Sequence, residues 1–133
     1  TLKQSGDYTL VQYLAAADVV VLPYTRTYQS GVLLAAYAAG RPVVVTDTGG
    51  LSEVVEEGRS GLVVPPGDAK ALAIGVVEIL VDSERLNAMG ERARHLATAL
   101  YGWDGIASRT IELYRSVVGK NRRGVQKGAS CVL

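Results

Sequence analysis

Two short polar segments of this sequence carry residue types that bind anions and sugars. The first, residues 24–31, reads YTRTYQSG and offers hydroxyl groups, the amide of Gln29 and one guanidinium. If Ser30 and Gly31 open a helix, the N–H groups of Ser30, Gly31 and Val32 have no partner within it and favour an anion such as phosphate. The glycine also lets a phosphate approach the backbone closely. The alternative is a surface turn in which Ser30 only caps the helix.

The second segment, Asp47-Thr48-Gly49-Gly50, combines a carboxylate and a hydroxyl with two glycines. Paired glycines adopt backbone geometries closed to other residues and permit close contact with a ligand. Glu53 follows in the next turn, where its carboxylate can accept hydrogen bonds from sugar hydroxyls. The alternative for Glu53 is a surface carboxylate that complements the positive end of a helix.

Other chemistries lack their motifs. No GxGxxG follows an apolar run and no GxxxxGK[ST] occurs, so the usual dinucleotide and P-loop sites are not predicted. His95 has no second His or Cys at metal-ligand spacing, so no metal site is expected. Ser30 has no motif-related His, which leaves a hydrolase triad unsupported. The single cysteine, Cys131, excludes a disulfide framework and suits the reducing cytoplasm.

The charge and hydropathy patterns limit the partners. The formal net charge is +1, and the basic residues Lys120, Arg122, Arg123 and Lys127 cluster without interleaved aromatics, which indicates a solvated tail and no nucleic-acid partner. No apolar run approaches the roughly 20 residues that a membrane span requires, so no transmembrane segment is expected. Peripheral contact with a membrane surface is compatible with this pattern.

Three apolar runs predict the strands that must position the polar segments. They are Val19–Leu22, Val43–Val45 and Leu62–Val64, each bounded by Gly or Pro. Apolar runs without alternation indicate strands covered on both faces, as in a parallel sheet. Helices from Ser30 or Gly31 to Ala39 and from Gly50 to Gly58 connect these runs, so both polar segments follow carboxyl ends of strands, where such sheets bind ligands. The predicted fold class is α/β, a Rossmann-like parallel sheet with flanking helices.

The rest of the chain reads as helical. A short helix follows an expected cap at Asp7, and two longer helices follow expected caps at Asp68 and Ser83. A last helix is predicted from Trp103 to about Val118. Residues 1–119 are therefore predicted to form one partial Rossmann-like domain with C-terminal helices, and residues 120–133 a disordered tail.

Five segments, taken in order, resemble the C-terminal half of family 4 glycosyltransferases. They are ADVVVLPY (17–24), QSGVLLAAYAAGRPVV (29–44), TDTGG (46–50), SEVVEEGRSGLVVPPGDAKALA (52–73) and YGWDGIASRTIELYRSV (101–117). The resemblance extends from Tyr13 to about Val118, nearly without gaps. As an ordered set the segments are highly specific, although each alone is weak.

This resemblance implies the donor-binding part of a GT-B enzyme that transfers a sugar, typically with retention, from a nucleotide diphosphate sugar substrate, with no separate cofactor and no metal. It also implies that the domain of residues 1–119 binds a nucleotide sugar. The acceptor, a carbohydrate or a lipid-linked molecule, would be bound mainly by an N-terminal domain outside this sequence, and the enzyme would act in the cytoplasm or at the cytoplasmic face of a membrane. The implied donor-binding residues are Gln29, Ser30, Gly31, Val32, Asp47, Thr48, Gly49, Gly50 and Glu53. No catalytic residue is named by the resemblance.

The sequence departs from the family pattern at one pair of positions. Many relatives carry two glutamates eight positions apart around the first polar segment, and the corresponding residues here are Thr27 and Ala35. The chain resembles a branch with PY…QSG in place of the glutamate pair. Two alternatives therefore stay open: a nucleotide-sugar epimerase relative, and a non-catalytic nucleotide-binding or interaction module of the same fold. The isolated chain is expected to be inactive without an acceptor domain.

Overall fold

The computed structural model describes residues 7–125, with side chains for residues 10–118. The chain divides into two units, Thr1–Thr98 and Ala99–Leu133, which we describe separately. The elements of the first unit are α1 (Asp7–Ala16), β1 (Val20–Leu22), α2 (Gly31–Ala38), β2 (Val43–Thr46), α3 (Leu51–Val54), β3 (Gly61–Val64), α4 (Ala69–Leu80) and α5 (Ser83–Ala99, whose last residue falls in the second unit).

The three strands form a parallel sheet in the order β1-β2-β3. Val44 pairs with Val21 on one side and with Leu62 on the other. The central strand is covered on both faces, because Val43, Val44 and Val45 are all completely buried. The prediction of an α/β fold with a parallel sheet and flanking helices is therefore confirmed.

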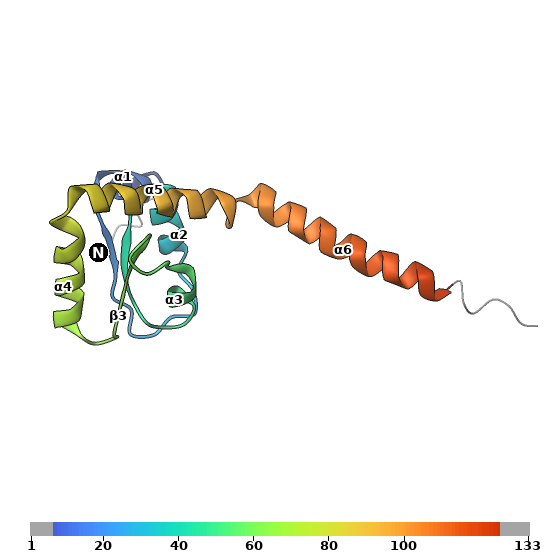
Figure 1. The fold of residues 1–133 in the computed structure, drawn as a ribbon, viewed down its shortest axis with the longest axis horizontal. Coiled ribbons are helices and arrows are strands. Elements are labelled where there is room, and N and C mark those ends of the chain that lie inside the picture. The colour runs from blue at the N-terminus through green and yellow to red at the C-terminus, as the bar shows by residue number, and fades with distance from the viewer. Residues whose placement is uncertain (1–6, 126–133) are drawn as a thin grey trace, which may run out of the picture. The chain divides into compact units, whose positions relative to one another are not determined.

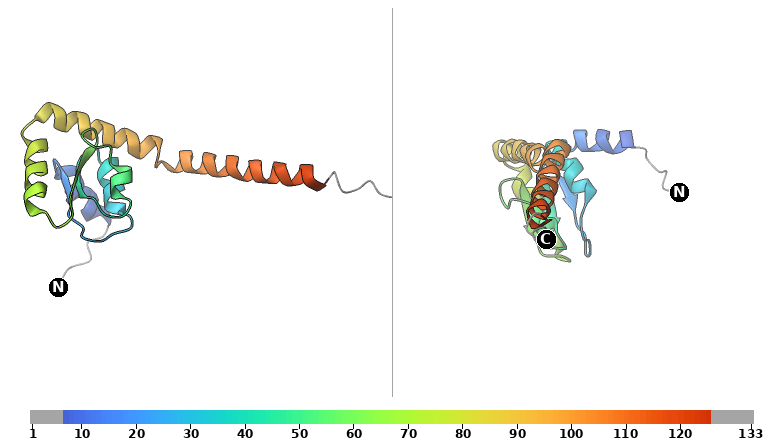
Figure 2. Two further views of the ribbon diagram at one scale, coloured as in Figure 1. Left: turned by 60° about the horizontal axis from the view of Figure 1, so that its bottom comes forward. Right: turned by 90° about the vertical axis from the view of Figure 1, so that its right-hand side faces the viewer.

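Two apolar clusters hold helices against opposite faces of the sheet. Val43 and Val45 belong to the cluster that contains Leu33 and Tyr37 of α2 and Leu51 of α3. Val44 belongs to the other cluster, with Leu62 of β3 and Ile79 of α4. Figures 1 and 2 show α4 on one side of the strands and α2 and α3 on the other. Helix α5 contributes to both clusters, through Met89 in one and Leu96 in the other.

The helix caps confirm two predictions and correct a third. Ser30 caps α2 and Asp68 caps α4, each accepting a hydrogen bond from an N–H group three residues ahead. The cap of α5, however, is Asp82 and not the predicted Ser83. The Asp82 carboxylate accepts from the N–H of Arg85 at 3.0 Å, and its carbonyl accepts from the N–H of Leu86 at 2.9 Å. Asp and Ser are both good caps, and only the backbone path decides between neighbours.

Helix α3 is shorter than predicted and ends at Val54 instead of Gly58. Val55 adopts an extended conformation (φ −83°, ψ 117°), and its side chain is buried in the core. The hydroxyl of Ser60 then accepts the N–H of Glu56 at 3.0 Å. Burial of the Val55 side chain thus outweighs helix continuation, and Glu56 and Glu57 lie in a loop.

The second unit contains α6, Trp103–Val125. The helix continues past the predicted end at Val118 and includes the start of the predicted tail, which corrects that boundary. One glycine inside a helix costs only about 1 kcal/mol relative to alanine, and no proline follows Gly119 to stop the helix. Residues 126–133 lie outside the described residues. The prediction that residues 1–119 form one domain stays a prediction.

Within the described residues, no helix is both long and apolar enough to cross a membrane.

Candidate functional site

The two polar segments meet at one edge of the sheet. They follow β1 and β2, whose carboxyl ends lie on the same side because the strands are parallel (lower part of Figure 1). The N–H of Gly50 in the second loop donates to the carbonyl of Tyr28 in the first loop at 3.0 Å. The loops therefore form one surface and do not lie at opposite ends of the sheet.

The glycine pair has a packing role at this junction. Gly49 adopts φ +56°, a region that other residues rarely occupy, and a Cβ atom added to it would collide with the carbonyl oxygen of Thr27. A Cβ added to Gly50 would lie 3.3 Å from the carbonyl oxygen of Tyr28. Both glycines thus permit close approach between the loops, and their contact with a ligand stays a prediction.

The N–H groups of the second loop are largely used within the protein. Asp47 donates to the carbonyl of Val64 and Thr48 to that of Thr46, both at 2.8 Å. With Gly50 bonded to Tyr28, only the N–H of Gly49 in this loop has no acceptor among the described residues. The tight turn after β2 therefore satisfies most of the N–H groups of this loop within the protein.

The first loop keeps its N–H groups available. The hydroxyl of Ser30 accepts from the N–H of Leu33 at 3.3 Å, which is the cap predicted as the alternative. The N–H groups of Ser30, Gly31 and Val32 still have no acceptor in the described part of the chain. The cap and the anion-binding geometry can therefore coexist, because the cap uses the N–H of Leu33, one position beyond Val32.

The two loops and the first turn of α3 also carry polar side chains. Gln29, Asp47 and Glu53 are exposed, and Thr48 is partly buried. Glu53 lies beside Gly50, with its Oε2 atom 4.0 Å from the position of an added Cβ. Neither Thr27 nor Ala35 is acidic: the hydroxyl of Thr27 donates to the carbonyl of Gln29 at 3.0 Å, and Ala35 is partly buried on α2.

Two contributions to this edge were missed by the sequence analysis. The hydroxyl of Thr46 donates to the carbonyl of Tyr24 at 2.5 Å and so joins the ends of β1 and β2. A hollow of about 170 Å³ lies beside it, lined by Pro23, Thr25, Thr46, Pro65, Gly67 and Asp68 among others. The loop after β3 therefore belongs to the same edge. Its sequence PPGD, directly after a predicted strand, was the available signal.

An ion pair fixes the segment that follows α3. Arg92 of α5 donates to both carboxylate oxygens of Glu56, at 2.6 and 2.5 Å. The hydrogen bond from Arg92, followed by its charge, outweighs the effect of burial and lowers the pKa of the Glu56 carboxyl below its ordinary value. The same hydrogen bond raises the pKa of Arg92. The Nδ1 atom of His95 lies 3.4 Å from the Nη1 atom of Arg92. No cluster of His, Cys, Asp and Glu suited to a metal ion occurs among the described residues.

A family model described as glycosyl transferases group 1 matches residues 3–82, more than half of the chain. The chain belongs to this family. It is 41% identical over 116 residues to the D-inositol 3-phosphate glycosyltransferase of Corynebacterium urealyticum, covering 87% of this chain and 27% of that protein. It is 37% identical over 109 residues to a GDP-mannose-dependent phosphatidylinositol monomannoside mannosyltransferase of Mycobacterium tuberculosis, covering 76% of this chain and 28% of that protein.

Solved structures of other proteins share the fold. Sucrose-phosphate synthase from Thermosynechococcus elongatus matches with a TM-score of 0.75 and 36% identity, over 84% of this chain and 28% of that one. HepE of Anabaena, solved in complex with UDP, matches with a TM-score of 0.73 and 27% identity, over 79% of this chain and 29% of that one. The chain thus spans little more than a quarter of the curated relatives it matches, and it corresponds to the C-terminal region of these GT-B proteins.

Proposed function

We propose that this chain is the donor-binding part of a glycosyltransferase that takes a sugar from a nucleotide diphosphate sugar. The observation that carries the proposal is the junction of the two loops, where Gly50 donates to Tyr28 beside the available N–H groups of Ser30, Gly31 and Val32. Three backbone donors at a helix N-terminus form a suitable seat for a diphosphate. The structure of HepE in complex with UDP supports the same ligand class.

The chemistry follows from where negative charge develops. When the bond between the sugar and the diphosphate breaks, charge builds on the departing diphosphate, and fixed N–H donors stabilise it without reorganising. Asp47 and Thr48 belong to the second loop and Glu53 to the helix that follows it. They are proposed to contact the sugar or ribose hydroxyls, together with Gln29 and the backbone of Gly49. The proposal invokes no metal and no separate cofactor, because backbone groups supply the stabilisation.

The finer assignment also belongs to this proposal. We assign the chain to family 4, in the branch with PY…QSG, with retention at the transferred carbon. The acceptor, a carbohydrate or a lipid-linked molecule, would be bound by a second domain. If the acceptor is lipid-linked, the reaction would take place at the cytoplasmic face of a membrane. The phosphatidylinositol monomannoside mannosyltransferase among the relatives supports a lipid-linked acceptor.

A second candidate is a non-catalytic module of the same fold. It is favoured by one observation, the absence of a carboxylate at Thr27 and Ala35. Calorimetric titration of the full chain with UDP, GDP and uridine separates the two. A working donor site gives heat with a nucleoside diphosphate, with a dissociation constant of about 1 mM or tighter, and none with uridine.

The absence of heat with both UDP and GDP at millimolar concentration supports an interaction module and contradicts the donor site. If a diphosphate binds, transfer, hydrolysis and epimerisation assays with UDP-glucose on the full-length protein identify the reaction. Epimerisation without transfer contradicts the glycosyltransferase assignment.

A further inference from the structure

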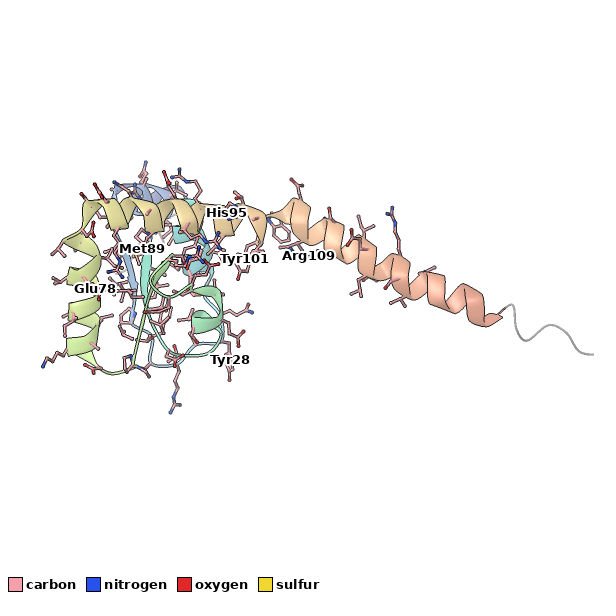
Figure 3. All side chains as sticks on the ribbon, viewed as in Figure 1. Tyr28, Glu78, Met89, His95, Tyr101 and Arg109 are labelled. Atoms are coloured by element: carbon pink, nitrogen blue, oxygen red, sulfur yellow. The ribbon has the colours of Figure 1, made fainter. Side chains whose placement is uncertain are left out.

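Tyr28 is an exposed aromatic residue on the first loop, and packing gives it no role. Its side chain is 93% exposed, the highest value among the large hydrophobic side chains of the described residues. Figure 3 shows it at the carboxyl edge of the sheet, beyond the ribbon of α3. Tyr37 offers a contrast within the same stretch of chain, because it is fully buried and its hydroxyl lies 2.6 Å from that of Ser60.

The backbone that carries the Tyr28 ring is held from both sides. Its carbonyl accepts the N–H of Gly50 at 3.0 Å, and the hydroxyl of Thr27 donates to the carbonyl of Gln29 across it at 3.0 Å. Gly49 packs directly against the carbonyl of Thr27. The ring is therefore exposed on a fixed loop. Binding a ligand would mainly restrict rotation about its two side-chain torsions, which keeps the entropic cost of the contact low.

The position of the ring relates it to the proposed donor seat. Tyr28 precedes Ser30 by two residues, and the N–H groups of Ser30, Gly31 and Val32 form that seat. The diphosphate of a nucleotide diphosphate sugar links two groups that contain rings, the nucleoside on one side and the transferred sugar on the other. Aromatic faces stack on nucleobases and pack against apolar faces of sugars.

We propose that Tyr28 is a specificity-determining residue whose ring packs against a ring attached to the donor diphosphate. This inference rests on the proposed function and assigns to it a contact that lies outside the predicted donor-binding residues. The hydroxyl of Tyr28 is not required for such a contact, whereas the aromatic face is.

The test uses the full chain and three variants. Tyr28→Ala removes the ring, Tyr28→Phe keeps it, and Tyr13→Ala removes a ring that is 70% exposed on α1, away from the two loops. Because the side chain of Tyr28 is so exposed, all three variants should keep the thermal midpoint of the parent. Each protein is titrated calorimetrically with pyrophosphate, UDP and UDP-glucose.

We expect Tyr28→Ala to weaken the binding of UDP or UDP-glucose by roughly fivefold or more, which is the loss of affinity typical of one stacking contact. Pyrophosphate should bind within about twofold of the parent, since it has no ring to stack, and Tyr28→Phe and Tyr13→Ala should match the parent throughout. An equal loss for UDP and UDP-glucose assigns the contact to the nucleoside, and a loss for UDP-glucose alone assigns it to the transferred sugar.

Unchanged binding of both nucleotides by Tyr28→Ala overturns this inference and leaves the proposed function intact. An equal loss of pyrophosphate binding also overturns it, because the effect then comes from the shape of the loop. If the parent chain binds GDP in place of UDP, GDP and GDP-mannose replace UDP and UDP-glucose in the same test. If the parent chain binds neither nucleotide and no pyrophosphate, both the proposed function and this inference fail.

Discussion

Replacement of Gly31 by proline removes one N–H group from the proposed diphosphate seat while preserving the helix. Proline is favoured at the first position of a helix, where Gly31 stands, because no helical hydrogen bond uses that N–H. The residue before a proline must be extended, and Ser30 already has φ −134° and ψ 112°. No neighbouring atom lies within 4 Å of a Cβ added at Gly31.

The expected size of the effect follows from the lost donor. A hydrogen bond to a charged group contributes roughly 1.5–3 kcal/mol, so Gly31→Pro should weaken UDP and pyrophosphate binding by about tenfold or more. The fold itself should be unchanged or stabilised by about 0.4–1 kcal/mol, since proline restricts the unfolded chain. Gly31→Ala is the matched control, because it keeps the N–H group.

Calorimetry on both variants measures the change in affinity, and thermal unfolding establishes that they remain folded. The result that refutes the reasoning is a folded Gly31→Pro protein that binds UDP as tightly as Gly31→Ala. The N–H groups at the start of α2 would then not contact the diphosphate.

Three further predictions test the fold that supports the site. Gly49→Ala should destabilise the protein by at least about 1–2 kcal/mol, because alanine incurs this cost in a left-handed conformation and its Cβ would also clash with a neighbouring carbonyl. The measurement is the thermal midpoint, which should fall. Asp82→Ala should cost about 1 kcal/mol in urea unfolding, whereas Ser83→Ala should be nearly neutral; the reverse order contradicts the assigned cap. The lowered pKa of Glu56 means that its pair with Arg92 stabilises the protein above about pH 4.5 and that this contribution is lost as the pH falls through the lower folded pKa. The difference in midpoint between the parent and Glu56→Gln should therefore shrink toward low pH, and a constant difference contradicts the pair.

Local signals in the sequence predicted much of the fold and the location of the loops. Unbroken apolar runs such as Val43–Val45 placed the strands, and the caps Ser30 and Asp68 were identified correctly because a cap bonds to an N–H three residues ahead. The boundary of α3 was wrong, since burial of the Val55 side chain ends that helix, and burial depends on the rest of the core. The hydroxyl of Thr46 was missed for a similar reason, because its acceptor on Tyr24 belongs to another strand end.

The sequence by itself determined the order of strands and helices and the presence of two polar loops at carboxyl ends of strands, because hydrophobic periodicity and capping act over a few neighbouring residues. Only the tertiary structure decided which N–H groups remain available to a ligand. The donor of Gly50 is used by Tyr28 and that of Asp47 by Val64, and Arg92 reaches Glu56 across 36 residues of chain. Such pairings follow from the packing of the whole sheet and its helices, so no local pattern records them.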